Sequence, residues 1–297
     1  MTTVRVLDDG LAPDQLGEGI FWDAETGAVF WVDIEGHLVH RYHVESATHQ
    51  YWRTSKQVSF AYPQDGHLIL CLADGVYRFD PERRVETPIA ILDLPAEHRL
   101  NDGKLDPQRR LWVGSINTAD DPGATAALYV LRDNALVEIE GGYVNANGKA
   151  WSPDGKLMYH ADTACGTIWE YDYEDETGTV SGKRVLVKVP DGNPDGLSID
   201  ENGNIIAAMY GAGCLKIFSF RGDQIGQIDL PVPNPTSSVL VGSTLYITTA
   251  FDGLSDEERK HNPDAGKLFV APYVSPRANS ALSQSQWSSA PAAKQGR

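Results

Sequence analysis

Four short motifs in the chain place an oxygen-bearing side chain beside a glycine. They are Gly17-Glu18-Gly19, Asn101-Asp102-Gly103, Asn147-Gly148 and Asp195-Gly196. Together they offer carboxylate and amide oxygens, which are the donors that hard or borderline divalent cations prefer. One divalent cation is therefore expected, with calcium, magnesium, manganese and zinc all as candidates. A structural zinc site is disfavoured, because the sequence has no cluster of Cys and His ligands.

Each of these motifs is weak by itself, since Asp-Gly is a common turn dipeptide. The same dipeptide recurs elsewhere in the chain, beginning at Asp9, Asp65, Asp74, Asp154, Asp191 and Asp252. A shared site therefore requires that the four motifs fall at one phase of a repeating structure.

Such a repeat is visible as a turn rich in Asp, Gly and Pro that is followed by a short apolar strand. Its six copies begin at Asp23, Gln64, Asp106, Ser152, Asp200 and Val241. Their spacing of roughly 40 to 47 residues is that of a four-stranded propeller blade. A second strand-like run with alternating apolar and polar residues follows each copy, for example Gly75-Val-Tyr-Arg-Phe.

The pattern predicts an all-β fold, a closed six-bladed β-propeller formed as a single domain by residues 1–274. The early strand that begins at Val4 is expected to pair into the last blade and close the ring. The best helical stretch is short, from Leu254 to Lys260. Residues 275–297 are rich in Ser, Ala and Gln and are expected to form a flexible tail.

The topology of a propeller predicts where the motifs lie. The innermost strands of all blades run in the same direction along the central channel, so their first residues gather at one mouth. Counting back from each turn gives these mouth positions: Glu18, Ser59-Phe60, Asn101-Asp102, Asn147, Asp195 and Thr236-Ser237. Four of the six hold a carboxylate or an amide beside a glycine, and this common register predicts one shared cation site.

Composition narrows the class of partner. The 297 residues carry a formal net charge of −16, which makes nucleic acid and anionic membranes poor partners. The three cysteines are widely spaced and the N-terminus lacks a signal-peptide core, so we expect a cytoplasmic protein without disulfides. We expect a monomer or a weak homo-oligomer. His37, His40 and His43 are expected at the surface, because a spacing of three puts strand neighbours on opposite faces.

Five segments in this order resemble the gluconolactonase and regucalcin-like (senescence marker protein) family of sugar lactonases. The segments begin at Leu16, Arg99, Asn147, Pro194 and Leu245, and the similarity extends to about Pro272. The resemblance implies a propeller with a central cation held by Glu18, Asn147 and Asp195. It also implies that Arg99 and Asn101 contact the substrate and that Asp102 lies beside the cation.

Three positions depart from the family pattern. Ile20 replaces a frequent proline, and Lys149 stands where an apolar residue is usual. In the loop Asn117–Asp121, Ala119 occupies the place where some relatives have a substrate-binding Glu. The resemblance therefore leaves the identity of the sugar open.

These observations predict a metal-dependent hydrolase that opens a small sugar (aldono-)lactone to the aldonic acid. The cation would stabilise negative charge on the carbonyl oxygen, and a carboxylate would take a proton from the attacking water. Asp195 is the preferred base and Asp102 the second choice. Two alternatives stay open: a phosphotriesterase-like or aryl-esterase-like propeller hydrolase, and a calcium-binding propeller without catalysis.

Overall fold

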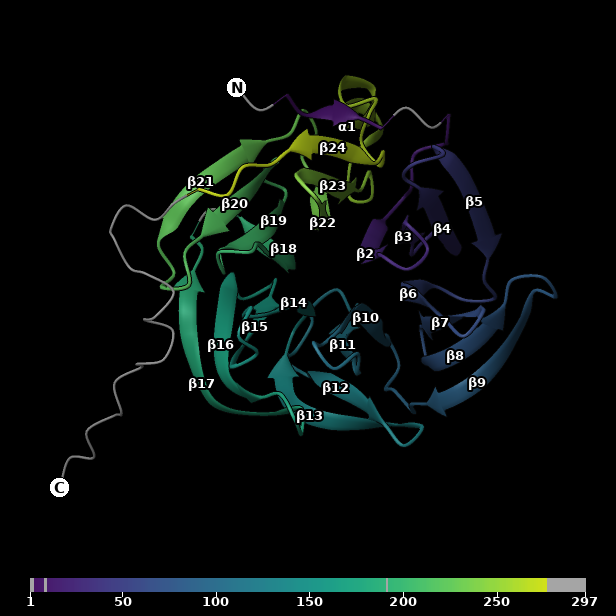
Figure 1. Cartoon of the computed structure of the whole chain (residues 1–297), viewed down its shortest axis with the longest axis vertical. Helices are drawn as coiled ribbons and strands as arrows, with labels where there is room; N and C mark the ends of the chain where they lie inside the picture. Colours follow the sequence, from purple (N-terminus) through teal and green to yellow (C-terminus); the bar gives the residue numbers. More distant parts are fainter. Residues whose placement is uncertain (1–2, 8–9, 191, 277–297) are drawn as a thin grey trace.

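The computed structural model describes residues 3–7, 10–190 and 192–276, and their strands form a ring of six blades around a central axis (Figure 1). Every blade is a four-stranded sheet in which neighbouring strands are antiparallel. The predicted all-β, six-bladed propeller is confirmed.

Each blade is built from the channel outwards. The innermost strands are β2 (Gly17–Asp23), β6 (Val58–Gln64), β10 (His98–Leu105), β14 (Ala146–Trp151), β18 (Asn193–Ile199) and β22 (Pro235–Val241). The second strands are β3 (Ala28–Asp33), β7 (His67–Leu72), β11 (Leu111–Asn117), β15 (Leu157–Asp162), β19 (Ile205–Tyr210) and β23 (Thr244–Thr249). The third strands are β4 (Leu38–His43), β8 (Gly75–Asp80), β12 (Ala126–Arg132), β16 (Thr167–Glu174), β20 (Cys214–Phe218) and β24 (Phe269–Pro272). The outermost strands are β5 (Thr48–Arg53), β9 (Val85–Ile91), β13 (Ala135–Tyr143), β17 (Thr179–Lys188), β21 (Gln224–Asp229) and β1 (Arg5–Val6).

The hydrophobic core lies between neighbouring blades. Six clusters of buried residues combine side chains from adjacent sheets, as where Phe30 of β3 and Leu70 of β7 belong to one cluster. The second strands are buried on both faces, so β3 reads as the continuous run Ala-Val-Phe-Trp-Val-Asp. This packing holds each innermost strand in place against the channel.

The ring is closed by the N-terminal strand, as the sequence predicts. In β1, Arg5 pairs with Val270 and Val6 with Phe269 of β24, and the amide of Leu7 donates to the carbonyl of Leu268 over 2.8 Å. The last blade therefore combines strands from both ends of the chain. This closure keeps the first and sixth blades side by side at the channel.

The short helix and one histidine of β4 show one agreement with the sequence-based expectations and one correction. The helix α1 (Asp256–His261) is capped by Ser255 and Glu258, close to the expected stretch. The expectation of a surface position was wrong for His40, whose side chain stacks on Trp31 and lies 3.2 Å from Asp14. Strand β5 covers this face through His49, which alternation along β4 alone could not indicate. Apart from Ser275 and Pro276, the predicted tail 275–297 lies outside the described residues.

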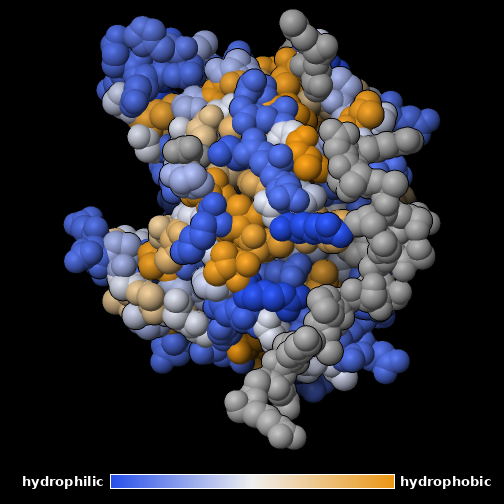
Figure 2. Space-filling view, turned by 90° about the vertical axis from the view of Figure 1, so that its left-hand side faces the viewer, coloured by the Kyte–Doolittle hydropathy of each residue, from blue (hydrophilic) through white to orange (hydrophobic). Residues whose placement is uncertain are grey.

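The outer rim carries most of the exposed apolar residues. Those with large side chains are Tyr51, Val85, Ile91, Val137, Val185 and Val274. All but the last lie on outermost strands. From the side of β17 and β21, hydrophobic residues show between hydrophilic ones (Figure 2). In the part of the chain that the structure describes, no helix is long and apolar enough to cross a membrane.

Candidate active site

The six innermost strands share a bulge at the same phase. Their pairing shifts register after Glu18 in β2, after Asn101 in β10 and after Pro194 in β18. Corresponding shifts follow Val58, Ala146 and Pro235. A bulge breaks strict alternation and re-aims the neighbouring side chains. The repeated bulge thus gives a structural basis for the common register of the sequence motifs.

The glycines beside the candidate ligands permit a close approach of neighbouring inner strands. A Cβ atom on Gly148 would lie 2.2 Å from the carbonyl oxygen of Asp195, and one on Gly196 would lie 2.2 Å from Oγ of Ser237. Such contacts are impossible without displacement of the backbone. The glycines therefore let adjacent strands converge tightly around the channel mouth.

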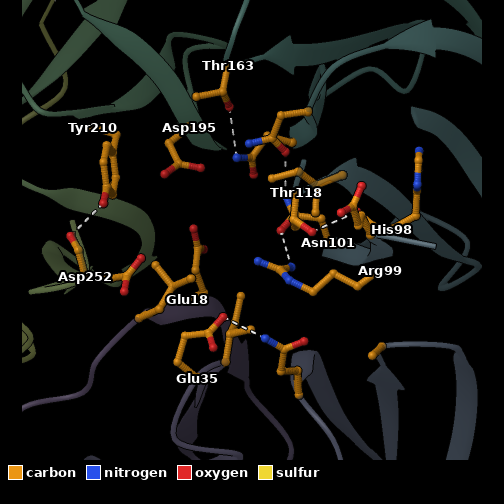
Figure 3. Close-up of a pocket in the computed structure, with 18 residues that line it drawn as sticks. Glu18, Glu35, His98, Arg99, Asn101, Thr118, Thr163, Asp195, Tyr210 and Asp252 are labelled. Carbon is orange, nitrogen blue, oxygen red and sulfur yellow. Dashed lines mark hydrogen bonds between the residues drawn. The ribbon is translucent and has the colours of Figure 1, made fainter. Parts of the chain in front are cut away.

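A cavity of about 660 Å³ opens at this mouth. Its lining includes five of the six side chains selected from the sequence: Glu18, Arg99, Asn101, Asn147 and Asp195. Glu18 and Asp195 project into the space from different blades, and Arg99 reaches in from another direction (Figure 3). The structure therefore brings two carboxylates, two amides and one guanidinium from four different innermost strands to one cavity.

Two buried oxygen atoms in the cavity have no hydrogen-bond partner. Asn147 donates through Nδ2 to Oγ1 of Thr163 over 2.9 Å, which leaves its Oδ1 without a partner, and Oδ1 of Asp195 is likewise unpaired. Both side chains are at least nine-tenths buried. An unsatisfied buried acceptor is costly, so it calls for a ligand or an ion. These oxygens and the carboxylate of Glu18 fit the donor set of a divalent cation.

The set of candidate cation ligands contains few acidic residues. Within the described ranges, no three His, Cys, Asp or Glu side chains are grouped so as to hold a metal ion. The candidate ligands comprise two carboxylates and one amide, so most of the coordination shell would be left to water and substrate. A site that open suits a catalytic cation better than a structural one.

Burial disfavours the ionised forms of Glu18 and Asp195 when no positive charge lies nearby. Desolvation, followed by the nearby charge of Asp102, raises the pKa of Glu18 to about 8. Desolvation and the charges of Glu18 and Asp102 raise the pKa of Asp195 well above its usual value. A bound cation would favour the ionised form of both groups.

Arg99 and Asn101 form a fixed polar network at the opposite wall. Nη1 of Arg99 donates to Oδ1 of Asn101 over 2.8 Å and to the carbonyl of Leu100 over 3.1 Å. Nδ2 of Asn101 in turn donates to Oδ1 of Asn145 over 2.8 Å. Burial lowers the pKa of Arg99, and neighbouring carboxylates oppose that change. The network orients the guanidinium for contact with oxygen atoms of a small molecule.

Asp102 occupies a different place from the other five. It is not among the residues that line the cavity, and its carboxylate lies 3.4 Å from Nζ of the fully buried Lys149. The same ammonium donates to the carbonyls of Asp102 and Asn147 over 2.8 and 2.6 Å. Lys149, one of the three departures from the family pattern, thus connects the bulges of β10 and β14.

The sequence analysis did not identify a second ring of residues that line the cavity. At or just after the end of its second strand, every blade contributes at least one residue to the cavity, among them Glu35, Ala73, Thr118, Thr163, Tyr210 and Asp252. The signal was available, because second strands run back towards the mouth at which innermost strands begin. In the third blade this place belongs to Thr118, whereas Ala119 does not line the cavity.

Comparison with known proteins agrees with this architecture. Residues 16–251 match the family described as "SMP-30/Gluconolactonase/LRE-like region". The chain belongs to this family. The matched region spans all the candidate site residues of this SMP-30/gluconolactonase-like chain.

Individual relatives cover almost the whole length. Pentonolactonase XacC of Haloferax volcanii is 33% identical over 91% of this chain and 94% of its own. The 6-deoxy-6-sulfogluconolactonase of Pseudomonas putida is 29% identical over 87% and 91%. A crystal structure of regucalcin from Agrobacterium tumefaciens, described as a calcium-binding protein, superposes with a TM-score of 0.85 at 26% identity, covering 93% of this chain and 96% of the other.

Proposed function

We propose that the chain is a metal-dependent lactonase that opens a sugar aldonolactone to the aldonic acid. The observation that carries the proposal is the pair of unpartnered buried oxygens, on Asn147 and Asp195, in a cavity shared with Glu18. Membership of a family with lactonases supports the reaction class. The regucalcin neighbour described as calcium-binding supports calcium as one candidate among calcium, zinc, manganese and magnesium.

The residues divide into three roles in this proposal. Glu18, Asn147 and Asp195 hold the cation, which when bound supplies Lewis-acid stabilisation of negative charge on the lactone carbonyl oxygen. Arg99 and Asn101 hold substrate oxygens and fix the orientation of the ring. Asp195 takes a proton from the water whose oxygen attacks the carbonyl carbon. The ring carbon–oxygen bond then breaks and the ring oxygen receives a proton.

Asp195 is the preferred base because of its place in the cavity. Asp195 lines the cavity, whereas the carboxylate of Asp102 faces Lys149 outside that lining. Asp102 therefore acts in this proposal as a support for the site. No covalent nucleophile is needed.

The test is a screen of aldonolactones by proton release, with cation-free protein and with calcium, magnesium, manganese or zinc added. We expect hydrolysis only when a divalent cation is present, and loss of activity on chelation. Bound cation should also raise the melting temperature, because it binds only the folded site. Full activity in excess chelator, with metal analysis finding no retained ion, contradicts the proposal.

The calcium-binding description of the regucalcin neighbour also favours a second candidate, a cation-binding propeller without catalysis. Calcium-dependent stabilisation without hydrolysis of any lactone, phosphotriester or aryl ester would support that alternative. The names of the two lactonase relatives specify a pentonolactone and a sulfogluconolactone. Family membership therefore does not decide whether the substrate is neutral or anionic.

A further inference from the structure

The wall of the cavity is strongly unbalanced in charge. Among the residues that the structure describes, its lining contains five carboxylate side chains but a single guanidinium, that of Arg99: the acids are Glu18, Glu35, Glu97, Asp195 and Asp252. A bound divalent cation would offset only part of this excess. The wall would then still be negative where it surrounds the part of a substrate that is remote from the cation.

Glu35 and Asp252 are the two acids that the second-strand ring contributes to this wall. They come from the second-strand ring of the first and sixth blades, which ring closure makes neighbours. Glu35 and Asp252 lie on the side of the cavity away from His98 (Figure 3). A lactone that reaches from Asp195 and Arg99 across to this side of the cavity would bring hydroxyl-bearing carbons to these two acids.

Both acids are held by an amide but keep free acceptor capacity. Nε2 of Gln57 donates to Oε1 of Glu35 over 2.7 Å, and Nε2 of Gln15 donates to Oδ1 of Asp252 over 3.1 Å. A carboxylate offers about four lone-pair sites, so one such bond leaves room for several hydroxyl donors. The hydroxyl of Tyr210 donates to the carbonyl of Asp252 over 2.9 Å and steadies the same loop. The two carboxylates are thus oriented acceptors at the cavity wall.

Arg99 does not reverse this preference. Its charge interacts favourably with Glu35, Glu18 and Asp252, and its Nη1 is bonded to Asn101 and to the carbonyl of Leu100. An anionic substituent near Glu35 and Asp252 would therefore meet like charges. The unpartnered oxygens of Asn147 and Asp195 in the same cavity show independently that the acids surround a site built for a ligand.

We infer that the cavity selects neutral, polyhydroxylated lactones and rejects lactones with an anionic substituent, and that Glu35 and Asp252 determine this selection. The inference rests on the proposed lactonase function and adds the substrate class. Hydroxyl groups of the substrate donate to the two carboxylates. A phosphate, sulfonate or carboxylate at the same place would be repelled and could not donate in this way.

The experiment compares D-glucono-1,5-lactone with its 6-phosphate, using the full chain loaded with the cation that supports activity. We expect kcat/KM for the neutral lactone to exceed that for the phosphate by at least about tenfold, because juxtaposed like charges are strongly unfavourable. Higher ionic strength should lower the ratio of the two kcat/KM values, since salt screens the repulsion between the phosphate and the carboxylates. Equal or better hydrolysis of the phosphate overturns the inference.

The double variant Glu35→Gln/Asp252→Asn tests the named residues. We expect the ratio of the two kcat/KM values to fall about tenfold, mainly because the phosphate becomes a better substrate. The matched control is Glu201→Gln, which removes a negative charge from an exposed turn at the far end of β18 and should leave the ratio unchanged. An unchanged ratio in the double variant, with its melting temperature near that of the parent, contradicts the assignment.

A binding measurement separates this inference from the proposed function. If neither lactone is hydrolysed, the proposed function fails, and the gluconolactam and its 6-phosphate can be titrated calorimetrically into the same proteins. Tighter binding of the neutral lactam to the parent, with the difference reduced in the double variant, still supports the selection. Tighter binding of the phosphate by the parent overturns it.

Discussion

Nζ of Lys149 lies 3.4 Å from Oδ2 of Asp102, and both side chains are buried beneath the mouth of the channel. The side chain of Lys149 is fully buried, so water cannot replace Asp102 as the partner of its ammonium group. It donates to two backbone carbonyls of β10 and β14, including that of Asn147. The pair therefore joins the strand that carries Arg99 to the strand that carries a candidate cation ligand.

Lys149→Met should destabilise the protein strongly, because it leaves the carboxylate of Asp102 buried without its partner. Breaking one side of a buried ion pair typically costs about 3–5 kcal/mol. The double variant Lys149→Met/Asp102→Asn should recover part of that loss, as measured by urea unfolding in a double-mutant cycle. The control Lys156→Met breaks an exposed pair with Asp154 and should change stability by at most about 1 kcal/mol. A similar, small effect of both Lys variants would contradict the role given to Lys149.

Much of the fold could be predicted because each blade repeats a turn and two strand patterns. The register of Glu18, Asn147 and Asp195 followed from counting back to the start of each innermost strand. The sequence did not supply the local change of direction at the bulges, because a glycine within a strand can mark a bulge, a tight bend or a close approach of another backbone. Asn101 and Asp102, adjacent in sequence, have different surroundings: Asn101 lines the cavity, whereas the carboxylate of Asp102 faces Lys149.

The second ring of lining residues was missed for a different reason. Glu35 and Asp252 follow apolar second strands, where a charged residue looks like an ordinary solvated loop residue. Their meaning depends on ring closure, which brings the first and last blades together across more than two hundred residues. His40 was mispredicted because its burial depends on a neighbouring strand.

Stability of the cation-free protein should depend on pH through Glu18. Its pKa is raised from 4.5 to about 8 in the folded protein, mainly by burial, so the folded state binds more protons than the unfolded state between these values. Stability should therefore fall as pH rises through this window. Urea unfolding in chelator at pH 5 and pH 8 measures the fall for the parent and for Glu18→Gln.

The comparison isolates Glu18 from other titrating groups. Glu18→Gln should show a shallower decrease, because its side chain cannot ionise. Saturating cation should also reduce the decrease, since it stabilises the ionised carboxylates. Identical pH dependence of the parent and Glu18→Gln in chelator would show that Glu18 does not titrate in this way.

Variants at the cavity should separate cation ligands from substrate contacts. Glu18→Gln and Asn147→Ala should weaken cation affinity, and extra cation should restore part of the activity. Arg99→Ala should leave cation affinity nearly intact while lowering kcat/KM, because its guanidinium contacts Asn101 and faces the substrate space. Calorimetric titration of each variant with the activating cation gives the affinities. Equal cation affinity in all three variants and the parent would refute the ligand assignment.

The last prediction decides the general base. Asp195→Asn keeps a side-chain oxygen that can ligate the cation, but it removes the group that accepts the proton. Loss of a general base typically lowers the rate by about 10²–10⁴-fold. The variant should therefore bind cation at saturating concentration and still turn over at least about a hundredfold more slowly.

Asp102→Asn is the matched comparison, because it makes the same chemical change at a carboxylate that faces Lys149 and does not line the cavity. Its activity should exceed that of Asp195→Asn when metal analysis shows both proteins fully loaded. Any decrease in the activity of Asp102→Asn should parallel its decrease in stability, because Asp102 acts on the site only through Lys149 and the two strands that Lys149 connects. The opposite ranking of turnover, at equal loading and with both proteins folded, would move the base to Asp102 and leave Asp195 as a ligand alone.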